Sequence, residues 1–231
     1  AKREAILNEP IYGPGIKVIN IFHEDKEFDM ERTEAFQRAK GVTDIQSFQS
    51  PKQKQEGLHA IGQSKGRTII NFSSHGGKED LWLTKGYANM SWRQTLAAMK
   101  GWAINYEELA DTLEVRGNLQ EVILLIDACY CYNFKANLLR ALAQRGVMIA
   151  KVAVAANLNR LTYLKNFQES LEEKHDGNGP LTVGDVLNTE YLLFIRFQDL
   201  GITVYLPPEE LIHLIRILTP SVDPSLNESS P

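Results

Sequence analysis

The sequence predicts an α/β fold in three layers, with a mostly parallel central sheet covered by helices on both faces. Segments with strand patterns alternate with segments with helix patterns along the 231 residues. The central strand segments are also continuously apolar, which is typical of strands buried on both faces of a parallel sheet. Because we find neither an internal repeat nor an interdomain linker, we expect one domain over residues 1–220. Residues 221–231 have the composition of a disordered tail.

Several segments have the apolar, β-branched composition of buried strands. They cover residues 15–22, 66–74, 120–129, 147–157 and 201–207. The segment 120–129 is the most apolar of them. In parallel sheets, reactive groups sit at the carboxyl ends of the strands. The residues that follow each predicted strand are therefore the first place to look for a site.

Helices are expected between these strands, over residues 29–41, 50–66, 105–117, 135–146, 162–175 and 182–194. The first three begin at residues whose side chains cap a helix N-terminus, namely Asp29, Ser50 and Asn105. Glu108 follows Asn105 at capping-box spacing. Residues 1–15 have the breakers of an irregular lead-in. The segment 78–103 holds all three tryptophans and is predicted to be a loop or hairpin that leads to a helix.

Charge and cysteine content exclude several classes of protein. The 25 basic and 29 acidic residues leave a net charge of −4, which favours neither nucleic acid nor an anionic membrane as a partner. No apolar run approaches the roughly 18–20 residues that span a bilayer, and no signal peptide is visible. The only cysteines, Cys129 and Cys131, cannot build a disulfide framework, so we expect a reducing, cytoplasmic setting. Because the chain begins with Ala1, we expect it to be a processed or excised part of a longer protein.

Two of the predicted strands end in residues that can carry chemistry. The strand over 66–74 is followed by His75 and two glycines, and the strand over 120–129 ends at Cys129. If these strands are parallel neighbours, the imidazole and the thiol emerge at one edge, about 5–10 Å apart. An imidazole beside a thiol favours the thiolate, or takes its proton during attack on a carbonyl, and then protonates the leaving amine. Backbone N–H groups of Gly76 and Cys129 are candidates for holding the oxyanion.

An apolar strand that runs into Ser-His-Gly-Gly at 74–77, with a second one ending in Asp-Ala-Cys at 127–129, resembles the caspase-like cysteine peptidases of clan CD. This group includes caspases, metacaspases and the bacterial CHAT domains. His75 precedes Cys129 by 129 minus 75, or 54, positions, and the spacing in caspases is roughly 50. As an order of strands and helices, the resemblance covers most of residues 15–207. It implies a caspase-hemoglobinase-like sandwich and a cysteine endopeptidase that needs no cofactor.

The resemblance also implies roles for individual residues. Cys129 would be the nucleophile, His75 the base, and Gly76 an oxyanion donor. Asp127 stands where caspases have a glutamine of the S1 pocket and metacaspases have an aspartate that pairs with a basic P1 residue. By this resemblance, Asp127 implies cleavage of a protein substrate after Arg or Lys. A second acidic wall would follow the first strand, and the candidates, which the sequence does not rank, are Glu24, Asp25 and Asp29.

Other interpretations stay open. After the nucleophile, residues 130–133 match neither the Arg-Gly turn of caspases nor the Ser-Gly of many metacaspases, which leaves the subfamily undecided. The same fold also supports transpeptidation, and a caspase-like pseudoenzyme would instead act as a scaffold for protein partners. A flavodoxin-like binding module is a further alternative. For a peptidase we expect control by processing, by calcium, or by an attached sensor domain or regulatory subunit.

The remaining candidates have simpler interpretations. Cys131 is predicted to be a packing residue, since a cysteine in an apolar segment usually is. Asp127 could instead cap the following helix or hold a turn. Four histidines stand without an evident partner and are predicted to be structural or at the surface; these are His23, His59, His175 and His213.

Overall fold

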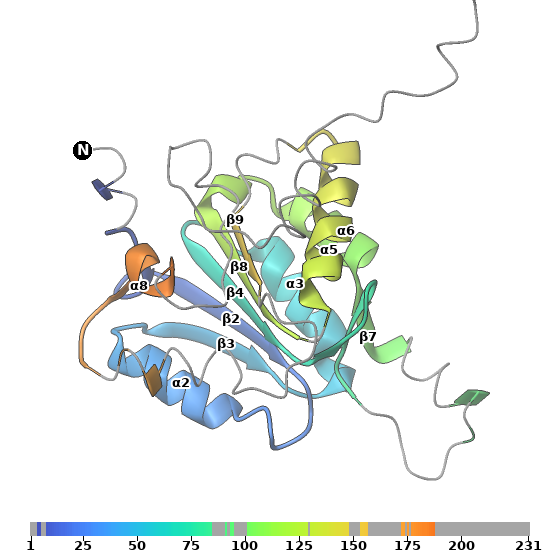
Figure 1. Ribbon diagram of the computed structural model, residues 1–231, viewed down its shortest axis with the longest axis horizontal. Coiled ribbons are helices and arrows are strands. Elements are labelled where there is room, and N and C mark those ends of the chain that lie inside the picture. Colours follow the sequence, from blue (N-terminus) through green and yellow to red (C-terminus); the bar gives the residue numbers. More distant parts are fainter. Residues whose placement is uncertain are drawn as a thin grey trace, which may run out of the picture.

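A computed structural model describes residues 4–5, 8–84, 91, 93–94, 101–128, 130–147, 153–156, 172–173, 175 and 177–187. Its centre is a five-stranded sheet of order β3-β2-β4-β8-β9, in which every neighbouring pair is parallel (Figure 1). The strands are β2 (Lys17–Phe22), β3 (Asp44–Phe48), β4 (Thr68–Ser73), β8 (Val122–Asp127) and β9 (Ala153–Ala156). The α/β class with a parallel sheet is therefore confirmed.

The three central strands end level with one another. Phe22 of β2 lies opposite Ser73 of β4, and Ser73 lies opposite Asp127 of β8. Two backbone hydrogen bonds continue the pairing past the strand ends, from His23 N to Ser73 O at 2.9 Å and from Ser74 N to Asp127 O at 3.0 Å. The condition on which the candidate site depends, that segments 66–74 and 120–129 are parallel neighbours, is met.

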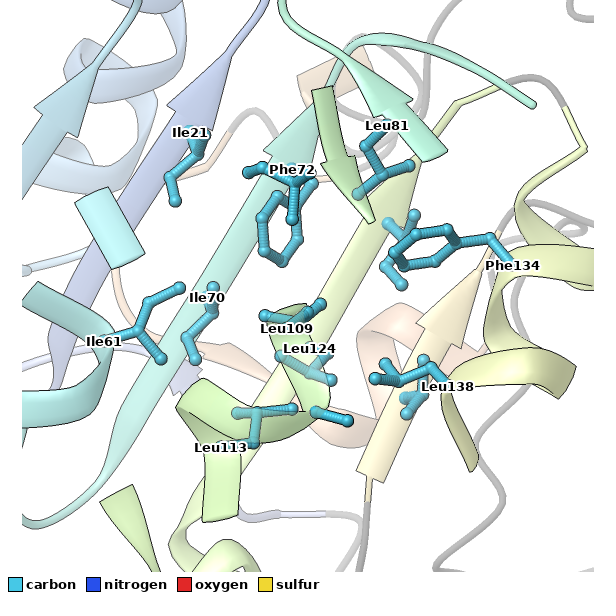
Figure 2. Packing of buried hydrophobic residues seen from close by; sticks show 14 of the residues in the cluster. Ile21, Ile61, Ile70, Phe72, Leu81, Leu109, Leu113, Leu124, Phe134 and Leu138 are labelled. Atoms are coloured by element: carbon cyan, nitrogen blue, oxygen red, sulfur yellow. The ribbon is translucent and has the colours of Figure 1, made fainter. Parts of the chain in front are cut away.

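One face of the sheet carries the main hydrophobic core. Three helices cover this face: α3 (Lys54–Gln63), α5 (Tyr106–Arg116) and α6 (Cys131–Gln144). Alternate strand residues such as Ile70, Phe72 and Leu124 point toward them, because successive side chains of a strand face opposite sides. Figure 2 shows Ile70, Phe72 and Leu124 in one cluster with residues of all three helices, including Ile61, Leu109, Leu113, Phe134 and Leu138.

The opposite face is covered by α2 (Met30–Ala39), below the sheet in Figure 1, and has a polar layer. Asn20 of β2 and Gln37 of α2 exchange two amide hydrogen bonds of 2.9 Å, and both residues are fully buried. Asn71 Nδ2 also donates to Asn20 Oδ1 at 3.3 Å. Gln37 Nε2 donates to the hydroxyl of Tyr12, whose pKa is raised by burial. These buried polar groups are all paired, as buried polar groups must be to avoid a desolvation penalty.

Replacing Asn20 by leucine should destabilise the protein by about 2–3 kcal/mol, because the amides of Gln37 and Asn71 would lose their hydrogen bonds to Asn20 inside the core. Urea unfolding of the single variant measures the loss. The double variant Asn20→Leu/Gln37→Leu is the control, and it should recover part of the stability, since the Gln37 amide is then absent and only Asn71 has lost its bond to Asn20. A single variant as stable as the wild type would contradict this account of the polar layer.

Two small antiparallel sheets accompany the central one. One joins β5 (His75–Gly76), β6 (Asp80–Trp82) and β7 (Ala103–Asn105) in that order. It organises both ends of the tryptophan-bearing segment, for which a loop or hairpin was predicted. The other pairs β1 (Pro10–Tyr12) with β10 (Leu181–Thr182), so the expectation of an irregular lead-in over residues 1–15 is wrong at Pro10–Tyr12. A short helix, α8 (Val183–Leu187), follows β10.

The predicted helix starts are mostly confirmed. Asp29 and Asn105 cap α2 and α5 through their side chains. Ser50 caps a 3₁₀ turn (Pro51–Gln53) that leads into α3, in a capping box with Gln53. The capping box expected at α5 is wrong, because the Glu108 carboxylate lies 2.7 Å from Lys54 Nζ of α3 instead.

Other boundaries differ from the predictions. The helix α6 begins at Cys131, four residues before the predicted start at 135. Strand β3 was not predicted at all. The strand predicted over 201–207, most of the helix over 162–175 and the tail over 221–231 lie outside the described residues. In the described part of the chain, every helix is too short or too polar to traverse a lipid bilayer.

Candidate active site

His75 lies just beyond the carboxyl end of β4, where the chain leaves the central sheet. It is the first residue of β5 and pairs with Trp82 of β6. Its side chain is 32% exposed, so the imidazole is held by the fold and still reachable from solvent. A half-exposed imidazole at this edge can exchange protons with a bound substrate.

Three side chains of the loop over residues 23–29 surround the His75 imidazole. The Glu27 carboxylate oxygen Oε1 lies 3.1 Å from His75 Nε2. The rings of His23 and Phe28 stand nearly perpendicular to the imidazole, with centroid distances of 4.8 Å and 5.1 Å. The loop that follows β2 therefore packs directly against the histidine that follows β4.

The prediction that His23 has no partner is wrong. The residue is fully buried against His75, and its Nδ1 accepts a hydrogen bond of 3.0 Å from the backbone N–H of Asp25. Because Nδ1 is the acceptor, a neutral His23 carries its proton on Nε2. The available signal was that His23 follows an apolar strand just as His75 does. This signal predicts a contact between the two histidines only if β2 and β4 are neighbouring strands, which the sheet order shows.

The candidates for a second acidic wall have separate positions. Glu24 accepts a hydrogen bond from the hydroxyl of Thr84, and Asp29 accepts one from the N–H of Arg32 as the N-cap of α2. Asp25 is the one that lies beside the two histidines. Glu27, which sequence reasoning did not consider, makes the direct contact with His75.

A metal ion is the obvious alternative for this group of side chains. Ligand atoms of His23, Asp25 and His75 all lie within 4.8 Å of one another. However, the lone pair of His23 Nδ1 already accepts the Asp25 N–H, and Nε2 of that tautomer carries a proton. A cation would have to displace this hydrogen bond to gain His23 as a ligand. The donor set therefore fits two packed histidines, each with its own hydrogen-bond partner, better than a metal centre.

Cys129, the predicted nucleophile, lies outside the described residues, but both of its neighbours are described. Ala128 is buried, and Tyr130 has a left-handed backbone with φ of 55°. The helix α6 begins at the next residue, Cys131, which is fully buried in the core, as predicted for a packing residue. In the sequence, Cys129 therefore stands directly before Tyr130, the N-cap of α6.

The two glycines after His75 have different environments. Gly76 is buried and pairs with Leu81 of β6. The N–H of Gly77 donates to Asp80 O at 2.8 Å, so this group is already engaged within the hairpin. Of the two, Gly76 therefore stays the better candidate for an oxyanion donor.

Asp127 is the last residue of β8, and only 5% of it is exposed. Successive side chains of a strand face opposite sides of the sheet, and the preceding residue, Ile126, belongs to the hydrophobic core. The side chain of Asp127 therefore lies on the α2 face. Its backbone carbonyl accepts the hydrogen bond from Ser74. Asp127 therefore lies at the sheet edge from which His75 emerges, and little of it faces solvent.

The remaining predicted residues are placed as follows. His59 is exposed on α3, in agreement with its prediction as a surface residue, and His213 lies outside the described residues.

Compared with protein-family models, with curated proteins and with solved structures, the chain has no significant match.

Proposed function

We propose that this chain is a cysteine endopeptidase with a caspase-like fold, in which Cys129 is the nucleophile and His75 the general base. One observation carries the proposal. Ser73 and Asp127 are paired across parallel strands, and His75 and Cys129 each follow this pair by two positions in the sequence. Neighbouring parallel strands deliver such residues to one edge of the sheet. The parallel sheet with helices on both faces is what the caspase-like sandwich requires as its frame.

The reaction follows from the chemistry of the two groups. His75 takes the proton of the Cys129 thiol, and the sulfur attacks the carbonyl carbon of the scissile peptide bond. Backbone N–H groups, with Gly76 and Cys129 as the candidates, stabilise the oxyanion. The protonated imidazole gives its proton to the leaving amine nitrogen, the C–N bond breaks, and a thioester stays on Cys129. A water molecule, deprotonated by His75, then attacks the thioester. The C–S bond breaks, the acid is released, and the protonated His75 returns its proton to the sulfur of Cys129.

Asp127 supports a substrate class. A carboxylate two residues before the nucleophile would pair with the guanidinium of Arg or the ammonium of Lys at P1. We propose protein substrates cut after basic residues.

A panel of fluorogenic peptides that differ at P1 tests the proposal, with and without calcium. We expect cleavage after Arg or Lys that Cys129→Ala abolishes. Cys131→Ala is the matched control, since it removes the buried thiol two residues away and should retain activity. Activity that persists in Cys129→Ala would overturn the assignment of the nucleophile. An added amine that appears in the acyl product would identify a transpeptidase.

The reactivity of Cys129 separates a latent enzyme from a scaffold. We expect iodoacetamide to modify Cys129 faster than a free cysteine at neutral pH, because an adjacent imidazole increases the thiolate fraction. Peptide mapping by mass spectrometry locates the modified thiol. A chain that cleaves no peptide and reacts only at the rate of free cysteine would favour a caspase-like scaffold that binds protein partners.

A further inference from the structure

We infer that Glu27 is a positioning residue that fixes the tautomer of His75, so that Nδ1 is the basic nitrogen. The inference deepens the proposed peptidase function and rests on it. Its basis is the distance of 3.1 Å between Glu27 Oε1 and His75 Nε2. An ionised carboxylate only accepts hydrogen bonds, so this contact requires a proton on Nε2. In the neutral imidazole the lone pair then resides on Nδ1.

The surrounding rings hold the imidazole in place for this contact. His23 and Phe28 pack against His75 at interplanar angles of 83° and 87°. His23 is itself fully buried and fixed by the N–H of Asp25. Packing therefore restricts rotation of the His75 ring, and the carboxylate determines which nitrogen carries the proton. The two ring nitrogens point in different directions. When Nε2 faces Glu27 in the loop over residues 23–29, Nδ1 therefore points away from the Glu27 carboxylate.

The loop that carries Glu27 is secured at both ends. The side-chain amide of Gln49 donates to the carbonyls of His23 at 3.1 Å and Phe28 at 2.8 Å. Within the loop, Phe28 N donates to Asp25 O at 3.0 Å. These bonds keep the loop against the sheet edge, so that the contact does not depend on Glu27 alone. This matters because the Glu27 side chain is 55% exposed, and an exposed pair without such support contributes little.

A general base needs its lone pair directed at the proton it removes. For His75 the proton comes from the thiol of Cys129, and an imidazole in the other tautomer would present N–H instead of a lone pair at Nδ1. The carboxylate would also stabilise the imidazolium that forms when the thiol is deprotonated. Glu27 therefore acts on the reaction through His75, without touching the substrate.

Nuclear magnetic resonance of ¹⁵N-histidine in the full 231-residue chain tests the inference directly. Long-range ¹H–¹⁵N correlations distinguish the two tautomers at pH 8.5, where an ordinary imidazole is neutral. The His75 signals are identified by their loss in His75→Gln. We expect the Nε2–H form in the wild type and a mixture of tautomers in Glu27→Ala. Glu27→Gln keeps an acceptor oxygen and should retain most of the Nε2–H form.

Glu31→Ala is the matched control, because Glu31 is an exposed acid in the first turn of the adjacent α2 and should leave the His75 spectrum unchanged. A His75 tautomer that is the same in the wild type and in Glu27→Ala would overturn the inference. An Nδ1–H form in the wild type would overturn it as well. The tautomer measurement requires neither a substrate nor an activator.

Kinetics give the second readout. We expect Glu27→Ala to lower kcat about 10-fold with KM changed by less than about 2-fold, since a positioning group acts on the chemical step. Glu27→Gln should recover most of the lost activity. The two proposals can fail separately. If Glu27→Ala changes the His75 tautomer but the wild-type chain cleaves no peptide and Cys129 is unreactive, the role of Glu27 is supported and the peptidase proposal is overturned. If the wild type cleaves peptides and the His75 tautomer is the same in Glu27→Ala, the peptidase proposal is supported and the role of Glu27 is overturned.

Discussion

Replacement of His75 by alanine should lower kcat for peptide cleavage by about 10³-fold with little change in KM. General base catalysis typically contributes 10²–10⁴-fold, and the same imidazole would serve as acid for the leaving amine. The loss falls on kcat because the imidazole acts in the transition state and does not bind the substrate beforehand. Steady-state kinetics on the best peptide of the P1 panel measure it. Iodoacetamide modification of Cys129 should slow in the same variant.

The controls for this prediction come from the packing around His75. Alanine at this position removes ring contacts with His23 and Phe28, so thermal unfolding must show that the variant is folded. His59→Ala is the matched variant, because this histidine is exposed on α3 and should retain full activity. A folded His75→Ala protein that cleaves at the wild-type rate would exclude the imidazole from the reaction.

Replacement of Asp127 by asparagine should reduce kcat/KM for peptides with Arg or Lys at P1 by about 100-fold. Asparagine has nearly the same shape but no charge, so the variant removes the ion pair with a basic P1 side chain and leaves the end of β8 intact. Peptides with a neutral P1 residue should lose much less, and the ratio between the two kinds of peptide is the quantity to measure. The shift in this ratio reports on the pocket and is independent of total activity.

Asp111→Asn is the matched control for Asp127, because Asp111 is an exposed aspartate of α5 that pairs with Arg145. It should leave P1 selectivity unchanged. If Asp127→Asn reduces cleavage of all peptides equally, Asp127 supports the sheet edge instead of the pocket. Cleavage after Asp in the wild type would retain the mechanism and exclude the basic P1 pocket.

Local sequence signals were sufficient for most of the scaffold near the site. The apolar runs that became β2, β4 and β8 are recognisable because strands buried on both faces need no polar alternation. The caps at Asp29 and Asn105 are recognisable because capping involves residues only two or three positions apart. By contrast, β3 has the sequence DIQSF and only half-buried or exposed residues, so it lacks the apolar run that identifies a central strand.

The sequence alone is sufficient to predict the class of fold and the positions of His75, Asp127 and Cys129 relative to the strand ends. These depend on composition and on short-range spacing, which a single chain displays directly. The contacts of His23 and Glu27 with His75 are visible only in the folded structure. These residues are 52 and 48 positions away from His75 in the sequence (75 minus 23 and 75 minus 27). Such contacts follow from the order and register of strands in the sheet, which the pattern within each strand does not encode.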